Sequence, residues 1–270
     1  MTAIQQQNPV NLATNSTANA TQPNQQQPFD KVYSLGQVIG KGPFSLIRIG
    51  THKSTGSQFA VKIIDVAKFT ATPGLSAKDL KREAKICSLL KHPNIIELLE
   101  VYTMGTCLYM VFELMEGKDL LSEIIKRVNA NYVYSEAVSA HYLKQVFEAL
   151  YYSHESSVVH RDVHPNCLLF NTRDNSASVK LGGFGTAIDL SEEKKDAESS
   201  NSLENDLGAL TIDSNNSDPP QGSNAIPTDR YFCSPEYLQD YRPSIKDDAW
   251  SCGVLTYLLV FGRTPFHCNY

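Results

Sequence analysis

The sequence has few features of a membrane, secreted or metal-cluster protein. Its 270 residues contain no apolar run of about 18 residues, so we expect no transmembrane helix. The N-terminus lacks a basic head followed by an apolar core, which argues against a signal peptide. The six cysteines form no Cys-x-x-Cys pair, which favours reduced thiols in a cytoplasmic protein over metal or disulfide roles. The net charge of -5 gives no reason to expect a nucleic-acid partner.

Two stretches lack the apolar residues that a folded core needs. Residues 1–28 consist largely of Gln, Asn, Thr, Ala and Pro and carry no charged side chain. Residues from about 190 to 227 are rich in Ser, Asn, Asp and Glu, with Lys194 and Lys195 as the only bases. Such segments cannot bury enough apolar surface to offset the entropy lost on ordering. We therefore predict a disordered N-terminal tail and a disordered acidic insertion.

The first ordered part, starting near Phe29, alternates strand and turn patterns. We expect strands at 32–39, after the Gly40–Gly42 turn, at 59–64, at 95–102 and at 107–112, with one helix at about 76–90. This pattern predicts a five-stranded antiparallel lobe with one helix. Gly40 and Gly42 free the backbone to approach a phosphate closely, although an ordinary hairpin would carry the same glycines.

A lysine and a glutamate in this lobe each have two readings. Lys62 lies inside an apolar strand and can simply point to solvent. Glu83 lies beside the apolar stripe of the predicted helix, among basic residues that can keep it solvated. The order of a strand lysine followed by a helix glutamate favours an ion pair between the two.

The stretch from Val158 to Gly185 predicts a polar loop followed by a hairpin. Two β-branched residues precede His160-Arg161-Asp162, and an apolar strand at 167–170 is joined by turn formers to a returning strand at 178–181. Helices are expected on both sides of this stretch. The first starts at the N-cap candidate Ser135, with an apolar stripe made by Leu143, Val146, Phe147 and Leu150. The second runs from 248 to 261 and is apolar nearly all round, which is typical of a buried helix.

This layout resembles the catalytic loop and metal-binding turn of protein kinases, H-R-D-x-x-x-x-N followed by D-F-G. The Gly40-Lys41-Gly42 turn, Val61-Lys62 and Ser234-Pro235-Glu236 match further kinase motifs in the right order. Within kinases, the chain is most similar to the calcium/calmodulin-dependent group and to the CASK family of membrane-associated guanylate-kinase scaffolds. The resemblance implies a bilobal α+β fold with an N-lobe at 29–114 and a mainly helical C-lobe at 115–270. We expect that C-lobe to be incomplete after its central helix.

The resemblance also implies an ATP site and a role for each matching residue. Asp162 would orient the acceptor hydroxyl, and Lys62 with Glu83 would position the phosphates. The residues implied to contact ATP are Ile39, Gly40, Gly42, Ile47, Ala60, Lys62, Glu113, Met115 and Asp119. Asp119 has a structural reading as well, because an acid at a helix N-terminus is stabilising by itself.

The chain departs from the kinase pattern at several positions of the site. Cys167 stands where kinases have the Asn that binds magnesium, and Gly183 stands where they have the Asp. Neither offers the hard oxygen that magnesium requires, and Asn166 is one residue out of place. His164 replaces a lysine that holds the transferring phosphate, and Asp229 replaces a threonine that helps to orient the catalytic aspartate. We therefore expect no metal site of the usual kind.

Two functions remain open. The first is an atypical serine/threonine kinase that binds ATP with little or no use of magnesium and transfers phosphate slowly. The second is an inactive pseudokinase that acts as a scaffold. By resemblance, partners would be protein substrates or scaffold proteins at cell junctions or synapses, and the calmodulin-binding segment of the family is absent from this chain. The expected location is cytoplasmic, with peripheral attachment to the plasma membrane through modules outside this chain.

Overall fold

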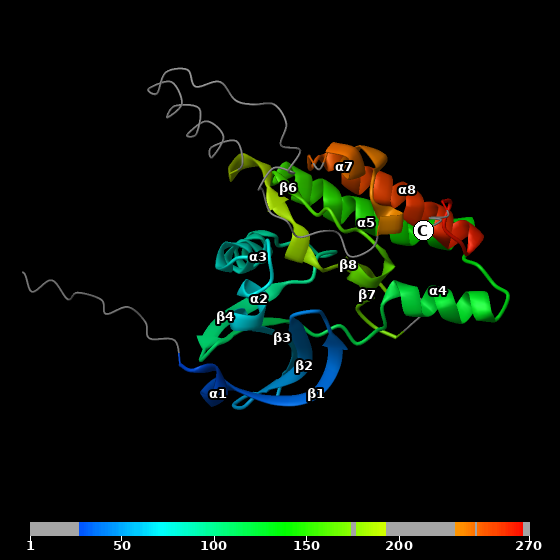
Figure 1. Ribbon diagram of the computed structural model, residues 1–270. Coiled ribbons are helices and arrows are strands. Elements are labelled where there is room, and N and C mark those ends of the chain that lie inside the picture. Colours follow the sequence, from blue (N-terminus) through cyan, green and yellow to red (C-terminus); the bar gives the residue numbers. More distant parts are fainter. Residues whose placement is uncertain (1–26, 174–176, 193–229, 241, 267–270) are drawn as a thin grey trace, which may run out of the picture.

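The computed structural model describes residues 27–173, 177–192, 230–240 and 242–266, arranged as two lobes (Figure 1). The tail predicted at 1–28 lies outside the described residues except for its last two positions. Most of the insertion predicted at 190–227 lies outside them as well, and so does Asp229.

Five antiparallel strands form the sheet of the N-terminal lobe, in the spatial order β1-β2-β3-β5-β4. The strands are β1 (Tyr33–Lys41), β2 (Ser45–His52), β3 (Gln58–Asp65), β4 (Leu98–Met104) and β5 (Cys107–Glu113). The prediction of a five-stranded antiparallel lobe is confirmed. The fourth strand starts later than predicted because Ile95 pairs instead with Leu181 of the other lobe.

Among the described residues, three helices accompany this sheet, two more than predicted. The helix expected at 76–90 is α3 (Ala77–Leu89), which starts with a capping box between Ser76 and Asp79. The unpredicted helices are α1 (Phe29–Val32) and α2 (Val66–Thr70), which are too short to show a helical period in the sequence. The prediction of a single helix in this lobe was therefore wrong.

The second lobe is mainly helical, as predicted. Its helices are α4 (Leu120–Asn129), α5 (Glu136–Glu155), α7 (Pro235–Asp240) and α8 (Ile245–Phe261). Its short strands pair as β6 (Val158–Val159) with β9 (Ile188–Asp189), and β7 (Leu168–Phe170) with β8 (Val179–Leu181). The predicted hairpin is β7–β8, although Cys167 belongs to the preceding 3₁₀ turn η1 (Pro165–Cys167). Figure 1 shows α5 and α8 running side by side in the centre of the lobe.

The sequence predicts the start of α5 and the end of α8 well, but α8 begins at Ile245 and not at 248, and one predicted buried position is not buried. The hydroxyl of Ser135 accepts a hydrogen bond from Val138 N, and Gly262 ends α8 in the left-handed conformation at φ 69°. Phe147, predicted to lie in the apolar stripe of α5, is instead half exposed and lines a surface groove with Tyr151 and Thr256. Among the helices of the described residues, none is both long and apolar enough to cross a bilayer.

One hydrophobic core continues through both lobes and fixes how they meet. It includes Ile86 and Leu98 of the first lobe and Leu168 and Leu255 of the second. The backbone between α3 and β4 is bound directly to β8, because Ile96 N donates to the carbonyl of Leu181 at 2.9 Å. The reciprocal bond from Leu181 N to Asn94 O is 2.8 Å long. These two bonds hold the backbone between α3 and β4 against β8, where the two lobes meet.

Candidate functional site

The glycine turn between β1 and β2 is tight. Gly42 N donates to the carbonyl of Ser45 at 2.9 Å, and a Cβ atom placed on Gly42 would lie 2.7 Å from the Ser45 hydroxyl. Gly40 pairs with Ile47, whose side chain a Cβ on Gly40 would meet at 3.3 Å. The turn thus accepts Ser45 where the kinase loop has a third glycine, and a side chain at Gly42 would require the Ser45 hydroxyl to move.

Lys62 and Glu83 form the predicted ion pair. The Lys62 ammonium on β3 donates to the Glu83 carboxylate, which α3 holds almost fully out of solvent. Ile47 pairs with Lys62 across the sheet, and Ala60 lies two residues along the same strand, so the three side chains share one face. The arrangement predicted for ATP contact is therefore present, and the contact with ATP stays a prediction.

The segment that joins the two lobes after β5, here called the hinge, begins at Glu113. Glu113 forms an interlobe ion pair that the sequence did not predict. Lys180 of β8 donates to both carboxylate oxygens of Glu113, at 2.7 and 2.8 Å. The same carboxylate accepts a hydrogen bond from Glu97 N at 2.8 Å. Met115 follows as a half-buried hinge residue, whereas Ile39 lies on β1 and is 45% exposed. The side chain of Glu113 thus joins the lobes, its backbone N–H donates to the carbonyl of Glu97 at 3.1 Å, and its contact with ATP stays a prediction.

Asp119 has a structural role at the start of α4. One carboxylate oxygen accepts from Ser122 N and the other from the Ser122 hydroxyl, both at 2.7 Å. This is the N-cap geometry that stabilises a helix start. The structural reading is confirmed, and the contact of Asp119 with ATP remains a prediction.

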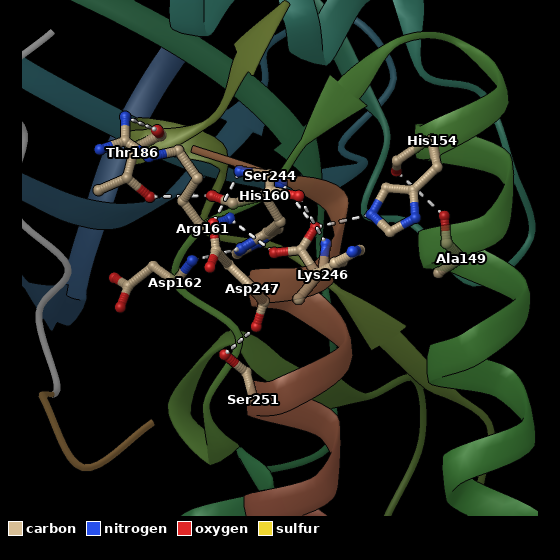
Figure 2. Close-up of polar contacts among 12 residues, drawn as sticks. Ala149, His154, His160, Arg161, Asp162, Thr186, Ser244, Lys246, Asp247 and Ser251 are labelled. Atoms are coloured by element: carbon tan, nitrogen blue, oxygen red, sulfur yellow. Dashed lines mark hydrogen bonds and ion pairs between the residues drawn. The ribbon is translucent and has the colours of Figure 1, made fainter. Parts of the chain in front are cut away.

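The loop after β6 is held by an acid in the first turn of α8. Asp248 is fully buried and accepts hydrogen bonds from His160 N at 2.9 Å and Arg161 N at 2.8 Å. His154 of α5 lies 2.8 Å from the same carboxylate. Figure 2 shows His154, His160 and Arg161 converging at this end of α8. These bonds stabilise Arg161 at φ 72°, a conformation that costs a non-glycine residue free energy.

Two side chains of this loop connect it to the segment after β8. The His160 ring is fully buried, lies 2.8 Å from the carbonyl of Gly182 and packs edge-on against Phe184. Burial lowers the pKa of His160, so its ring is neutral near pH 7. The Arg161 guanidinium donates to the carbonyl of Thr186 at 3.2 Å and to the hydroxyl of Tyr237. The loop and the segment therefore form one hydrogen-bonded unit.

Asp162 follows directly and is 8% exposed. The Nε2 atom of His164 lies 3.7 Å from its carboxylate. The other ring nitrogen, Nδ1, accepts a hydrogen bond from Asn166 N at 3.2 Å, which fixes the ring with Nε2 toward Asp162. The predicted catalytic acid and the residue in place of the kinase lysine are thus neighbours.

The two degenerate metal positions lie next to each other. A Cβ atom placed on Gly183 would be 3.1 Å from the Cβ of Cys167. The Cys167 thiol is buried, donates to the carbonyl of His164 at 2.9 Å and has a strongly raised pKa because of its burial. A protonated thiol and a glycine do not fit magnesium, which requires oxygen ligands. Asn166 is exposed, and the described residues contain no group of three side chains able to hold a metal ion.

Three residues of the site were missed from sequence: Asp248, Lys180 and Tyr237. Asp248 carried a usable signal, since an acid in an otherwise apolar, buried helix needs hydrogen-bond donors. Lys180 and Tyr237 carried none, because each looks like an ordinary surface or core residue and finds its partner only through the fold.

Comparison with known proteins agrees with this geometry. The sequence matches the family description "Protein kinase domain" over residues 33–269. "Calcium/calmodulin-dependent protein kinase type II" of Caenorhabditis briggsae is 36% identical over 241 residues, covering 88% of this chain and 38% of that protein. "Protein lin-2" of Caenorhabditis elegans is 34% identical over 238 residues, covering 88% of this chain and 22% of that protein. The chain thus spans well under half the length of these relatives.

Proposed function

The chain belongs to the protein kinase family, and on that premise we propose that it is an atypical serine/threonine kinase of the CASK type. It binds ATP in the cleft between the lobes with little or no use of magnesium, and it transfers the terminal phosphate slowly to protein hydroxyls. Asp162 orients the acceptor hydroxyl. Lys62, fixed by Glu83, orients the phosphates.

The observation that carries the proposal is the Lys62–Glu83 pair of the N-terminal lobe, together with buried Asp162 in the loop after β6. Phosphoryl transfer depends on positioning and charge stabilisation more than on covalent chemistry by the protein. A site that keeps its positioning residues can therefore retain slow transfer. The lost oxygen ligands at Cys167 and Gly183 support the part of the proposal that concerns magnesium.

Nucleotide binding with magnesium and with a chelator tests the proposal most directly. We expect ATP to bind in both conditions with similar affinity, because the residues that would hold the metal are gone. Binding that strictly requires magnesium would exclude the metal-free reading. Transfer to a protein substrate should be lost in Asp162→Asn, and transfer that survives this change would exclude the role given to Asp162.

A pseudokinase scaffold is the second candidate, and the arrangement around Asp162 favours it. Cys167, Gly183 and His164 all depart from the kinase pattern within one small region. In that case the fold itself, with or without nucleotide, would present surfaces to partner proteins. Undetectable transfer together with intact partner binding would support the scaffold.

The partners and the location extend the same proposal. We infer protein substrates or scaffold partners at cell junctions or synapses, and a cytoplasmic protein held at the plasma membrane by modules outside this chain. Similarity to "Protein lin-2" and to calcium/calmodulin-dependent kinases supports the kinase-like part of this proposal. Co-purification of the full-length protein from membrane and soluble fractions would test the location.

A further inference from the structure

Helix α5 exposes a face that carries two large aromatic side chains. Phe147 is 50% exposed and Tyr151 is 68% exposed, although both lie within a helix of 20 residues. Ala140 and Lys144 are exposed on the same face, because positions 140, 144, 147 and 151 follow one another at spacings of three and four residues. Two helices that pack along each other use this spacing. We call these four residues, together with the exposed Glu148, the α5 seam.

A groove runs beside the α5 seam, where α5 packs against α8. Ala140 lines one end of this groove, and Tyr151 lines the other end, about 16 Å further along the helix. Thr256 is the lining residue from α8. The end at Ala140 can receive a large side chain, because alanine has no atom beyond Cβ, and the end at Tyr151 can supply one.

The α5 seam is complementary in size to a second copy of itself. We consider an antiparallel pair of α5 helices about a two-fold axis that passes between Lys144 and Phe147. In this pair, Ala140 of each copy faces Tyr151 of the other. Lys144 of each copy faces Phe147 of the other, so that its aliphatic stem covers the exposed ring. Each copy thus inserts its large ring at the small end of the other copy's groove.

The same arrangement is complementary in charge. Glu148 follows Phe147 directly, so Lys144 of one copy also comes close to Glu148 of the other. Within one helix these two groups lie 3.7 Å apart and are 75% and 48% exposed. Such an exposed pair contributes little, so both groups can be shared with a second copy. At the ends of the pair, Glu155 approaches Glu136 of the other copy, and salt screens this repulsion because both are exposed.

We propose that two copies of this chain associate through their α5 seams. A partner of one charge sign would suit a surface of the opposite sign, whereas the seam carries both signs at positions that a two-fold axis brings together. Interfaces near about 1,000 Å² in total are the smallest that are stable, so a single pair of helices predicts a weak dimer. We expect a dissociation constant of about 10 μM. The interface lies outside the proposed ATP site and does not depend on it.

The test measures self-association of the whole chain by sedimentation equilibrium, from about 1 to about 200 μM. Lys144→Glu and Glu148→Lys should each weaken the dimer at least about tenfold, because the two-fold axis repeats every repulsion. A mixture of these two variants should regain the wild-type affinity. In the mixed dimer one copy carries two acids and the other carries two bases, so every facing pair again has opposite charges.

The mixture distinguishes contacts between copies from effects within one helix, since each variant keeps its own intrahelical repulsion. Lys78→Glu, the same charge change at an exposed position of α3, should dimerise as the wild type does. Tyr151→Ala should weaken the dimer about tenfold without any change of charge. A wild type that stays monomeric at about 200 μM, a dimer that both charge reversals leave intact, or a mixture no stronger than its components would overturn the proposal. Circular dichroism during thermal unfolding shows that each variant is folded.

Discussion

The two lobes keep the kinase pattern to different degrees. On the side of the N-terminal lobe, Gly42, Lys62 and Glu83 are in place and bonded as the family pattern requires. On the opposite side, Cys167 and Gly183 have replaced both metal ligands at one spot. The residues that match the charge-positioning part of the kinase pattern are present, whereas its two metal-ligand positions carry a thiol and a glycine.

The framework under the altered side is nevertheless complete. Asp248 holds the backbone of His160 and Arg161, and the His160 ring packs on Phe184 only one residue after Gly183. The bonds that Asp248 makes to the loop backbone are therefore distinct from the side chains that would bind a metal. The bonds from Asp248 and the ring contact of His160 do not involve the side chain of position 167 or 183, whereas the Cys167 thiol bonds to His164 within the same loop.

The largest effect should come from the framework that both sides share. Asp248→Asn places an amide NH₂ against backbone N–H donors in a site that is fully buried, and each unsatisfied group there costs 1–3 kcal/mol or so. We expect about 3 kcal/mol of destabilisation, measured by urea denaturation, with Asp30→Asn, at an exposed position of α1, as the control. A loss below about 1 kcal/mol would mean that this carboxylate does not hold the loop.

The retained side should give the next largest effect, on ATP binding. Lys62→Met removes the ammonium and leaves the buried Glu83 carboxylate facing the phosphates. We expect ATP affinity in chelator to fall by about thirtyfold, which corresponds to about 2 kcal/mol. Isothermal titration calorimetry measures it, and Lys68→Met, an exposed lysine of α2, is the control. Unchanged ATP affinity would show that the Lys62–Glu83 pair serves the stability of the fold and not nucleotide binding.

The two metal-ligand positions can be restored by substitution, and the expected change in ATP affinity is smaller. Cys167→Asn together with Gly183→Asp restores two oxygen ligands, so magnesium should raise ATP affinity by about tenfold where it has little effect on the wild type. Gly183 has φ 81°, a conformation that Asp tolerates better than most residues do.

The control for this pair is Cys167→Asn with Gly183→Ala, which adds the same Cβ atom beside position 167 without a carboxylate. An equal effect of magnesium on ATP affinity in the two double variants would show that the absence of these two oxygen ligands does not explain the weak effect of magnesium on the wild type.

The sequence predicted contacts between elements that follow each other in the chain, and it missed contacts between residues that lie far apart in the chain. The sheet, α3 and the hairpin β7–β8 follow from local periodicity and turn residues, and all were predicted. The Lys62–Glu83 pair was predicted because its two elements follow each other in the chain. The Glu113–Lys180 pair spans 67 residues and two lobes, so no local pattern contains it. Asp248 lies 88 residues from His160, and only the fold shows that they meet.

The failures have equally physical causes. The helices α1 and α2 are shorter than two helical turns, so their sequences contain no measurable period. Phe147 has the correct spacing for the buried stripe of α5, but the groove on that side leaves its ring half exposed. Periodicity identifies the apolar face of a helix, whereas what covers the face depends on the packing around it.

The smallest expected effect is on the stability at alkaline pH, and it compares one buried thiol from each lobe. Burial raises the pKa of Cys87, one turn after Glu83, and the pKa of Cys252 in α8 to about 12 each. Both thiols therefore stay protonated in the folded state above about pH 9, where the unfolded chain loses these protons. Stability is therefore complete below pH 9 and falls as the pH rises, by about 1 kcal/mol per thiol between pH 9 and pH 10. Urea denaturation at both pH values should show a shallower decline in Cys87→Ala and in Cys252→Ala, with the half-buried Cys107→Ala as the control. An equal decline in all of these variants would place the alkaline sensitivity elsewhere in the core.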